Sequence, residues 1–429
     1  GSIENATKDA TLQTTAKALD NTCVAIAALA ADARSSDQST LLGACQNLAG
    51  DAKTVGAVDT ALSSIRNEEA FSASDATLDI ARSVVSNLSG RLDAIARGNR
   101  SGGADFSNLK LGLVPVQMAA LESGAVSGLA SGVNQLLTGT SDGANSKLAF
   151  FFAGDLQFGK RGSRSAAGRR KVDSLALTAG IDYLLSESWV AGAAITYSRQ
   201  SADFSSTFST LDAKGITYSI YSSVELGRAH LDGHISYATR DYNSERAIGF
   251  SAGTSTIDQL AKSEYTGTDW IAGVRGSVPL NSGKWQFNLI GGATYVKSDI
   301  DSYLEEGAGA FNLSVAKQSE DYLVGDMGLR LTTSLELGET KLSPEFDAEY
   351  NIASGRDTRT LRAGFAVDPL SRQDLFLTST GDSDTDYFTL GVGLMANIDR
   401  ATLRVKYTTI LGLANTTSHQ IGVGLRLPF

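Results

Sequence analysis

Proline, cysteine and histidine are scarce in this chain, which has 5 Pro, 2 Cys and 3 His among 429 residues. Two cysteines are too few for a small scaffold held together by disulfides, and with three histidines they leave little material for a zinc cluster. Long apolar runs are also missing. The longest, residues 24–31, is well short of the roughly 18 residues that a membrane-spanning helix needs. These absences exclude a transmembrane helix but not a transmembrane β-barrel, whose strands need only alternate.

Positive charge is in deficit as well. The chain has 37 Lys and Arg against 47 Asp and Glu, a formal net charge of −10, which argues against a nucleic-acid partner. The 42% share of hydrophobic residues is in turn too high for a disordered chain. We therefore expect a folded protein that binds no nucleic acid.

Residues 1–146 are predicted to be mainly helical. Within residues 76–97, apolar side chains recur every three, four or seven positions, as on one face of a helix. Ser74 stands where an N-cap is expected, and Gly98 where a C-cap is expected. Helical spacing is also found in the segments 6–33, 40–49 and 116–137.

From residue 147 onward the hydrophobic period becomes two. In residues 340–352, Leu342, Phe346 and Tyr350 share one face, and polar residues occupy the other. Alternation over ten or more residues is typical of a tilted membrane-spanning strand rather than of a strand in a soluble sandwich. The segments predicted as strands are 148–159, 173–184, 189–199, 212–226, 228–241, 262–278, 284–297, 320–335, 340–352, 384–397, 400–410 and 417–429.

The connections between these twelve segments alternate between short and long almost without exception. Residues 185–188, 227 and 279–283 are short connections, whereas residues 243–261 and 353–383 are long ones. An outer-membrane barrel has short periplasmic turns and long outer loops, while a soluble sandwich has no reason to sort its loops by side. We therefore predict an all-β transmembrane barrel of twelve antiparallel strands in residues 147–429, preceded by an N-terminal α-helical region in residues 1–146.

The same register places charged side chains on the face opposite the aromatic ones. A polar lumen is the only place within a membrane where so many charges are tolerable. The residues expected to line it are Asp155, Asp182, Glu225, Asp232, Arg275, Asp326, Arg330, Glu345, Asp347, Glu349, Arg404, Lys406 and Arg426.

A helix is expected to pass through this lumen, because twelve strands enclose enough space for one. Four glycines would make room for it, namely Gly391, Gly393, Gly422 and Gly424. We expect residues 76–97 to plug the barrel, with residues 116–137 as the alternative. The arginines of the helix would then face lumen carboxylates.

Three segments, 173–183, 190–198 and 211–221, carry a resemblance to a known family. With the strand order and the terminal Phe429, they resemble the C-terminal translocator domain of autotransporters, the type V secretion proteins of Gram-negative bacteria. The resemblance covers residues 151–429. It implies a monomeric outer-membrane barrel that anchors an N-terminal passenger and exports it to the cell surface.

The last strand of this family carries a signal for the barrel-assembly machinery, which the resemblance therefore implies as a partner. Gly424, Leu427 and Phe429 occupy the glycine and apolar positions of the signal, whereas Gly422 stands where a polar residue is usual. Phe429, as the terminal aromatic residue, is expected to carry most weight.

Two further residue sets concern the compartment and the membrane surface. Cys23 and Cys45 are expected to form a disulfide that clasps two helices, because the periplasm and the cell surface are oxidising. A basic cluster in the first outer loop is either a solvated loop or a contact for the phosphates of lipopolysaccharide in the outer-membrane lipids. Its members are Lys160, Arg161, Arg164, Arg169, Arg170 and Lys171.

Signs of enzymatic chemistry are weak. Ser383 follows a Gly-Asp pair as in some esterases, but it lies in a predicted outer loop. His230, Asp232 and His234 alternate toward the lumen, where an ordinary polar cluster is a better interpretation than a metal site. His419 follows a serine at the outer end of the last strand, which is weak support for a hydrolase. We expect no catalytic residues, no metal and no cofactor.

Two functions remain open at this point. The first is a translocator that exports and displays a passenger, with its pore plugged by an N-terminal helix. The second is a passive outer-membrane channel or structural protein whose N-terminal helices form a periplasmic module. The side of the membrane on which residues 1–100 lie, cell surface or periplasm, distinguishes them.

Overall fold

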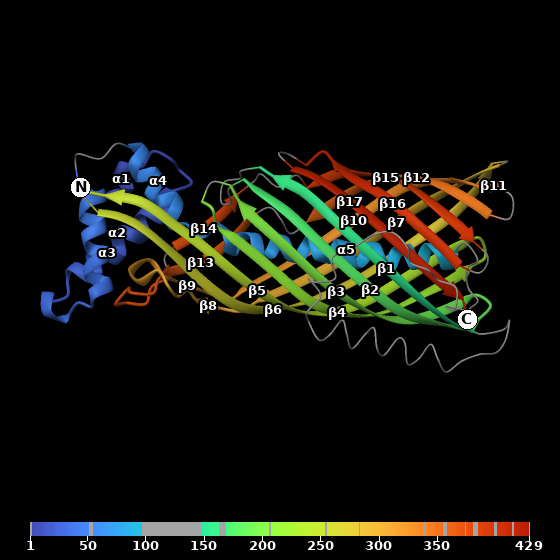
Figure 1. The fold of residues 1–429 in the computed structure, drawn as a ribbon, viewed down its shortest axis with the longest axis horizontal. Coiled ribbons are helices and arrows are strands. Elements are labelled where there is room, and N and C mark those ends of the chain that lie inside the picture. The colour runs from blue at the N-terminus through green and yellow to red at the C-terminus, as the bar shows by residue number, and fades with distance from the viewer. Residues whose placement is uncertain are drawn as a thin grey trace.

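Twelve long antiparallel strands close into a barrel (Figure 1). The computed structural model describes residues 2–50, 55–96, 147–162, 169–205, 207–253, 255–282, 284–337, 340–354, 358–373, 375–380, 385–398, 401–413 and 416–428. The barrel strands are β1 (Leu148–Arg161), β2 (Arg170–Ser186), β3 (Trp189–Phe204), β4 (Thr210–Leu226), β5 (Ala229–Ala252), β6 (Ser255–Ser282), β7 (Trp285–Ile300), β10 (Gln318–Thr333), β12 (Thr340–Ser354), β15 (Asp386–Ile398), β16 (Ala401–Leu411) and β17 (Thr416–Pro428). Every predicted strand is present, so the fold class is confirmed.

The ring of strands has no open edge. β1 pairs with both β2 and β17, and β10 pairs with both β7 and β12. A short strand, β11 (Leu335–Leu337), continues along β12 at the end where the strands are joined by short turns. Gly227 forms one of these turns with a φ of 66°, a conformation that glycine adopts readily. Closure satisfies every edge, which matters because lipid offers no hydrogen-bonding partner to an open one.

The hairpin of β5 and β6 is much longer than predicted. The sequence predicted strands at 228–241 and 262–278 with a loop between them, but the two strands stay paired up to Ala252 and Ser255. Beyond Glu245, β5 has no partner in β4, so the hairpin protrudes past the barrel rim. It reaches the N-terminal helices (Figure 1). Ile248 and Phe250 are buried in the same core as those helices. This packing stabilises the extension of the hairpin, and the local sequence periodicity does not reveal it.

Two other long connections, predicted as loops, contain a second sheet. Its strands are β8 (Tyr303–Leu304), β9 (Leu313–Val315), β13 (Thr358–Phe365) and β14 (Leu375–Thr380), and a 3-10 turn, η3 (Gly309–Phe311), lies between β8 and β9. Residues far apart in sequence pair here, for example Ala363 with Val315. Such short strands form only because the two loops meet, which explains why the sequence did not predict them.

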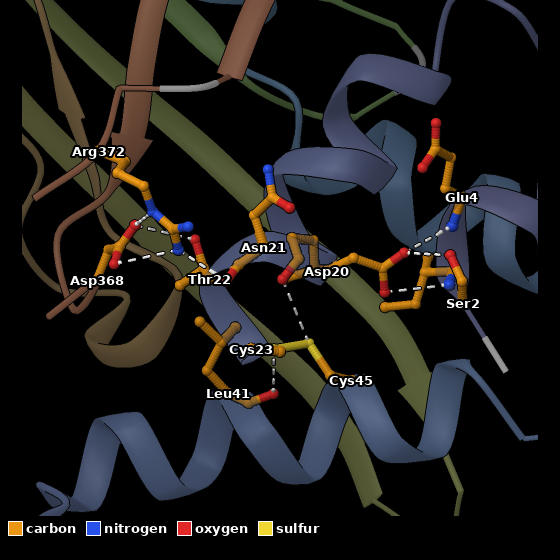
Figure 2. Close-up of a disulfide and its surroundings, with 12 residues drawn as sticks. Ser2, Glu4, Asp20, Asn21, Thr22, Cys23, Leu41, Cys45, Asp368 and Arg372 are labelled. Atoms are coloured by element: carbon orange, nitrogen blue, oxygen red, sulfur yellow. Dashed lines mark hydrogen bonds and ion pairs between the residues drawn. A yellow bond between two sulfur atoms is a disulfide. The ribbon is translucent and has the colours of Figure 1, made fainter. Parts of the chain in front are cut away.

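The helices before α5 gather at the long-loop end of the barrel (Figure 1). They are α1 (Ile3–Ala6), α2 (Gln13–Ala27), the 3-10 turn η1 (Ala31–Ala33), α3 (Ser36–Leu48) and α4 (Val55–Ile65). Ser35 and Gln38 form a capping box that starts α3. The Cys23–Cys45 disulfide joins α2 to α3 (Figure 2), as the sequence predicted. No helix among the described residues combines the length and the apolarity needed to cross a bilayer.

Helix α5 (Glu68–Ala96) runs inside the barrel (Figure 1). Its 29 residues span about 43 Å, and it contacts β1 to β5, β7 and β17. It starts earlier than the predicted segment 76–97. Ser74 is not its N-cap but an internal residue whose hydroxyl donates to the Phe71 carbonyl. Asn67 is the residue whose side chain accepts from the Ala70 N–H at 2.8 Å and so caps the helix.

Candidate functional site

The barrel interior around α5 is the candidate functional site. On one side, Leu78 and Ala81 of α5 pack against Ile271, Val296 and Tyr322 of the wall. These apolar contacts sit among many polar ones, since most of α5 is buried although it carries Asp, Ser, Asn and Arg. A buried polar helix is stable only when those groups find partners, and the barrel wall supplies them.

Arg91 of α5 forms the best-defined helix–wall ion pair. Its Nε and NH2 groups donate to the two carboxylate oxygens of Asp182 at 2.6 and 2.7 Å, and both side chains are buried. Tyr221 also donates to Asp182, at 3.2 Å. A two-pronged guanidinium–carboxylate contact fixes orientation as well as distance, so it sets the rotation of α5 within the barrel.

Asp93 lies at the centre of a second charge network nearer the C-terminal end of α5. Its carboxylate accepts from Arg330 at 2.6 Å and lies 3.7 Å from Arg404. Arg404 donates in turn to Glu345 at 2.5 Å. Asp347 lies 2.8 Å from Lys406 and 3.4 Å from Arg330, so five wall charges and one helix charge neutralise one another.

The N-terminal half of α5 uses acidic residues. Asp79 accepts from Arg161 of β1, and Asp75 accepts from Arg170 of β2. Both arginines lie at the outer ends of their strands and are buried. The two carboxylates are four residues apart, one helical turn, and so meet neighbouring strands.

Neutral hydrogen bonds complete the contact. Ser83 donates to Asp155 at 3.0 Å, and Asn87 donates to Thr178 at 2.9 Å. Thr77 shares a hydrogen bond of 2.9 Å with Tyr242. Polar partners therefore extend along most of the length of α5.

The expected lumen-lining residues fall into three groups by placement. Asp155, Asp182, Asp232, Arg330, Glu345 and Asp347 are buried. Glu225, Arg275, Asp326, Glu349, Arg404 and Lys406 are half-buried. The side chain of Arg426 lies outside the described part of the structure. Sequence reasoning expected helix arginines to meet wall carboxylates; Arg91 does so, whereas Arg82 stays with Asp79 of its own helix at 3.3 Å.

Sequence reasoning missed the acidic half of this interface. Asp75, Asp79 and Asp93 of α5 bind wall arginines, with the charges reversed from the expected arrangement. These contacts could have been predicted from the acidic residues of the amphipathic helix together with the arginines expected to face the barrel interior. The alternative helix, residues 116–137, and Arg97 lie outside the described residues.

Two of the four inward glycines have a different use from the one predicted. A Cβ on Gly391 would lie 2.0 Å from Asp347, and one on Gly393 would lie 2.7 Å from Glu345. These two glycines thus make room for wall carboxylates, not for the helix. Gly422 and Gly424 instead border a cavity of about 80 Å³ between the wall and α5.

Helix α5 does not fill the lumen evenly. A cavity of about 190 Å³ separates it from the wall formed by β6, β7, β10, β12, β15, β16 and β17. Arg275, Asp326, Arg330 and Glu349 are among the residues that line it. The space beside the helix is therefore polar and charged.

Arg246 of β5 joins three elements at the outer mouth of the barrel. Its Nε and NH2 groups donate to the two carboxylate oxygens of Glu305 at 3.0 and 2.5 Å. NH1 donates to the backbone carbonyl of Ile65 at 2.9 Å, which satisfies the C-terminal end of α4. Asn67 donates to Glu305 at 2.9 Å, so the N-cap of α5 belongs to the same cluster.

Glu69 is buried beside this cluster. It lies on the first turn of α5, near Ser209 and Arg246, which both lie just beyond the last paired residues of β4 and β5, Thr210 and Glu245. Burial raises the pKa of its carboxyl to about 8, and the Ser209 hydroxyl and Arg246 counteract that rise only in part. The carboxyl is therefore mostly protonated at neutral pH.

The residues weighed for enzymatic chemistry do not assemble. Ser418 is buried and accepts from Gln157 at 2.9 Å, whereas His419 shares a 2.7 Å hydrogen bond with Tyr407 on the outer face. Adjacent strand residues point to opposite faces, so these two cannot act as a pair. Among the described residues, no three His, Cys, Asp or Glu side chains are grouped to hold a metal ion. Ser383 lies outside the described residues.

The basic cluster is divided between the two faces of the wall. Lys160, Arg169 and Lys171 are exposed. Arg161 and Arg170 are buried against α5, so the expectation that they meet lipopolysaccharide is wrong for these two. Arg164 lies outside the described residues.

The C-terminal signal residues lie on β17, the strand that closes the ring. Gly424 lies opposite Ala153 of β1, and Leu427 lies opposite Phe150. Phe429 lies outside the described residues.

A closed twelve-stranded barrel with lipid-compatible side chains outside and a charged interior defines an outer-membrane β-barrel protein. A family model described as the autotransporter beta-domain matches residues 150–408. The chain belongs to this family, whose barrels serve type V secretion.

Among solved structures, the chain is similar to the translocator domain of the autotransporter NalP from Neisseria meningitidis. The identity is 18%, the TM-score is 0.52, and the match covers 74% of this chain and 100% of that one. It is also similar to the beta domain of the Bordetella autotransporter BrkA, at 12% identity and a TM-score of 0.48, covering 66% and 100%. The transport unit of AIDA-I from Escherichia coli matches at 10% identity and a TM-score of 0.44, covering 71% and 98%. No curated protein sequence matches the chain.

Proposed function

We propose that this barrel exports a passenger to the cell surface and anchors it there, and that α5 then occupies the pore. The observation that carries the proposal is the path of the chain. The helices before α5 lie at the long-loop end, and α5 leads from them into the barrel interior. A chain exported through the pore would end in this arrangement. Residues 1–146 would be the passenger end and pore helix, and residues 147–429 the translocator.

The orientation follows from the loops. Long loops of outer-membrane barrels face outward, and α1 to α4 lie at that end. They dock on the long loops through side chains such as Arg372, which donates to the Asn21 carbonyl at 2.7 Å (Figure 2). We therefore propose that residues 1–65 lie at the cell surface.

The occlusion of the pore rests on the contacts of α5. Paired charges at Arg91 and Asp93 hold the helix against the wall. Two cavities of about 80 and 190 Å³ remain beside the helix. Conductance should therefore be low while α5 is present.

Single-channel conductance in a planar bilayer tests the plug. A variant that lacks residues 1–140 should conduct several times more current than the full chain, because the pore area available to ions increases. The shift of the folded barrel on unheated gels verifies that the variant is closed. Equal conductance in both proteins would reject α5 as the plug.

The alternative is a passive channel or structural protein with a periplasmic helical module. Proteolysis of intact cells separates the two, with an epitope tag placed in the connection between α3 and α4. Loss of the tag supports export, while protection in intact cells and loss only after outer-membrane permeabilisation supports the alternative. A periplasmic protein serves as the control for membrane integrity.

We propose a non-enzymatic role and a monomeric state. The family is one of translocators, and each α5 finds its ionic partners within its own barrel. The barrel-assembly machinery is the proposed insertion partner, through the C-terminal residues Gly424, Leu427 and Phe429.

A further inference from the structure

Two like-charged pairs lie side by side where β1 and β2 reach the outer rim. Lys160 lies directly opposite Lys171, and Arg161 lies directly opposite Arg170. Because side chains alternate along a strand, the two arginines point into the barrel and the two lysines point out of it. Like charges directly opposite each other destabilise a sheet unless an opposite charge compensates them.

The inner pair is compensated within the chain. Asp75 of α5 lies between the two arginines, 3.2 Å from Arg161, and Asp79 binds Arg161 as well. Two carboxylates therefore match two guanidinium groups. The pairing is complete once α5 is in the barrel.

The positive charges on the outer face are neutralised only in part by carboxylates of the chain. Lys171 is held by Asp173 and lies opposite Asp203 of β3. Among the described residues, Lys160 and Arg169 have no carboxylate within 4.0 Å. Both side chains are exposed. The face therefore carries two cations that are free to bind an external anion.

This positive spot has an apolar surface beneath it. Leu156 and Phe158 of β1 point the same way as Lys160 and are 51% and 42% exposed. Elsewhere on the rim the exposed lysines have acidic neighbours: Lys262 of β6 binds Glu245 at 2.8 Å, and Lys297 of β7 lies directly opposite Asp321 of β10. An anion with acyl chains would therefore be held at β1 and β2 rather than around the whole rim.

We propose that Lys160, Arg169 and Lys171, here called the outer cation cluster, bind the phosphate group of an outer-leaflet lipid whose acyl chains lie on Leu156 and Phe158. The outer-leaflet placement rests on the proposed orientation. Lysine and arginine make charge-assisted hydrogen bonds to phosphate oxygens, and Arg169 can do so with two donors at once. The ligand class is a phosphorylated glycolipid of the lipid A type.

Binding of purified lipid to the full chain in detergent micelles tests the site. The probe is a fluorescent lipid A with two phosphates, compared with the same lipid after enzymatic removal of both. The variant Lys160→Gln/Arg169→Gln should bind the phosphorylated lipid about tenfold to thirtyfold more weakly than the unaltered chain. Binding of the dephosphorylated lipid should not change, because the apolar surface is intact.

The control is Lys262→Gln/Lys297→Gln, which removes two exposed rim lysines from β6 and β7 that have acidic neighbours, Glu245 at 2.8 Å from Lys262 and Asp321 opposite Lys297. Its lipid affinity should equal that of the unaltered chain. Equal loss in both double variants, or no preference for the phosphorylated lipid, would overturn the site. The measurement does not depend on which side of a membrane the helices occupy. A negative result would therefore leave the proposed export function intact, and misorientation in cells would leave the binding result intact.

Discussion

At the scale of single residues, loss of the Arg91 side chain should destabilise the protein strongly, because its partner Asp182 is buried with it. Removing the guanidinium would leave the Asp182 carboxylate in the wall with the Tyr221 hydroxyl as its remaining partner among the described residues. An uncompensated buried charge costs about 3–5 kcal/mol. The lost free energy should destabilise the contact between α5 and the wall rather than the wall itself, since Asp182 stays in β2.

We predict that Arg91→Ala releases α5 from the wall and lowers the unfolding midpoint of the chain in urea. Hydrogen exchange of the α5 amides should speed up by more than tenfold. Arg82→Ala is the control, since Arg82 is on the same helix but its ion pair is with Asp79 of that helix, and its contact with the wall is a stacking contact with Tyr387 rather than a buried charge pair. If the two variants exchange at the same rate, the Arg91–Asp182 pair does not hold the helix.

The buried carboxyl of Glu69 should make the stability of the folded protein depend on pH. The pKa of its carboxyl is about 8 in the folded protein against an ordinary value of 4.5, because burial disfavours the charged form. Below about pH 4.5 the carboxyl is protonated in both the folded and the unfolded state, so its ionisation does not affect the free energy of unfolding. As the pH rises from there to 8, the unfolded state loses its proton first, so stability falls.

Glu69→Gln should remove that part of the pH dependence. The variant keeps the shape of the side chain but cannot ionise, so it should be more stable than the unaltered chain at pH 9 and similar at pH 4. Unfolding midpoints across this range provide the measurement. Parallel curves for the two proteins would show that Glu69 does not titrate on unfolding.

At the scale of elements, the α2–α3 hairpin is fixed by a covalent and a docking contact. The disulfide closes a sequence separation of 22 residues, with Cα atoms 6.5 Å apart. Beside it, Thr22 donates to Asp368 at 3.4 Å and so ties α2 to an outer loop (Figure 2). The disulfide therefore stabilises the α2–α3 hairpin and also the docking of that hairpin on the outer loop that contains Asp368.

We predict that Cys23→Ala/Cys45→Ala lowers the stability of this hairpin by about 3 kcal/mol. Limited proteolysis should then cut α2 or α3 faster, while the barrel strands remain resistant. Thiol labelling of the unreduced, unaltered chain should find no free cysteine. Full labelling would show that the two cysteines are not bonded in the purified protein.

At the scale of the whole molecule, closure of the barrel depends on the last strand. β17 pairs with both β1 and β16, so the ring cannot close before the C-terminus is in place. A recognition signal on this strand would deliver the chain to the assembly machinery at the step that completes the barrel.

Deletion of Phe429 should lower the amount of barrel in the outer membrane several-fold. The helices α1 to α4 should fold as before, since outside their own bundle their main contacts are with β5, β13, β14 and η3 rather than with β17. Membrane fractionation with a gel assay for the folded barrel gives the measurement, and deletion of Gly1 and Ser2 serves as the matched terminal control. Normal insertion without Phe429 would show that this residue is not part of the signal.

The sequence by itself determined the barrel, its strand number and the facing of its charges. Those features follow from a period of two and from alternating loop lengths, which are local and which lipid enforces on every strand. It also indicated the disulfide and a helix close to the true α5. Residues 340–352, for example, form β12 almost as predicted.

Only the tertiary structure decided which charges meet. Of the neighbouring basic residues, Lys160 lies on the exposed outer face, whereas Arg161 points inward and binds Asp79, a partner that only the docking of α5 supplies. In the outer sheet, β9 and β13 pair residues about fifty positions apart, and Arg246 brings together α4, β5 and Glu305. Such contacts depend on how two loops and a helix end meet in space, which no local pattern of residues encodes.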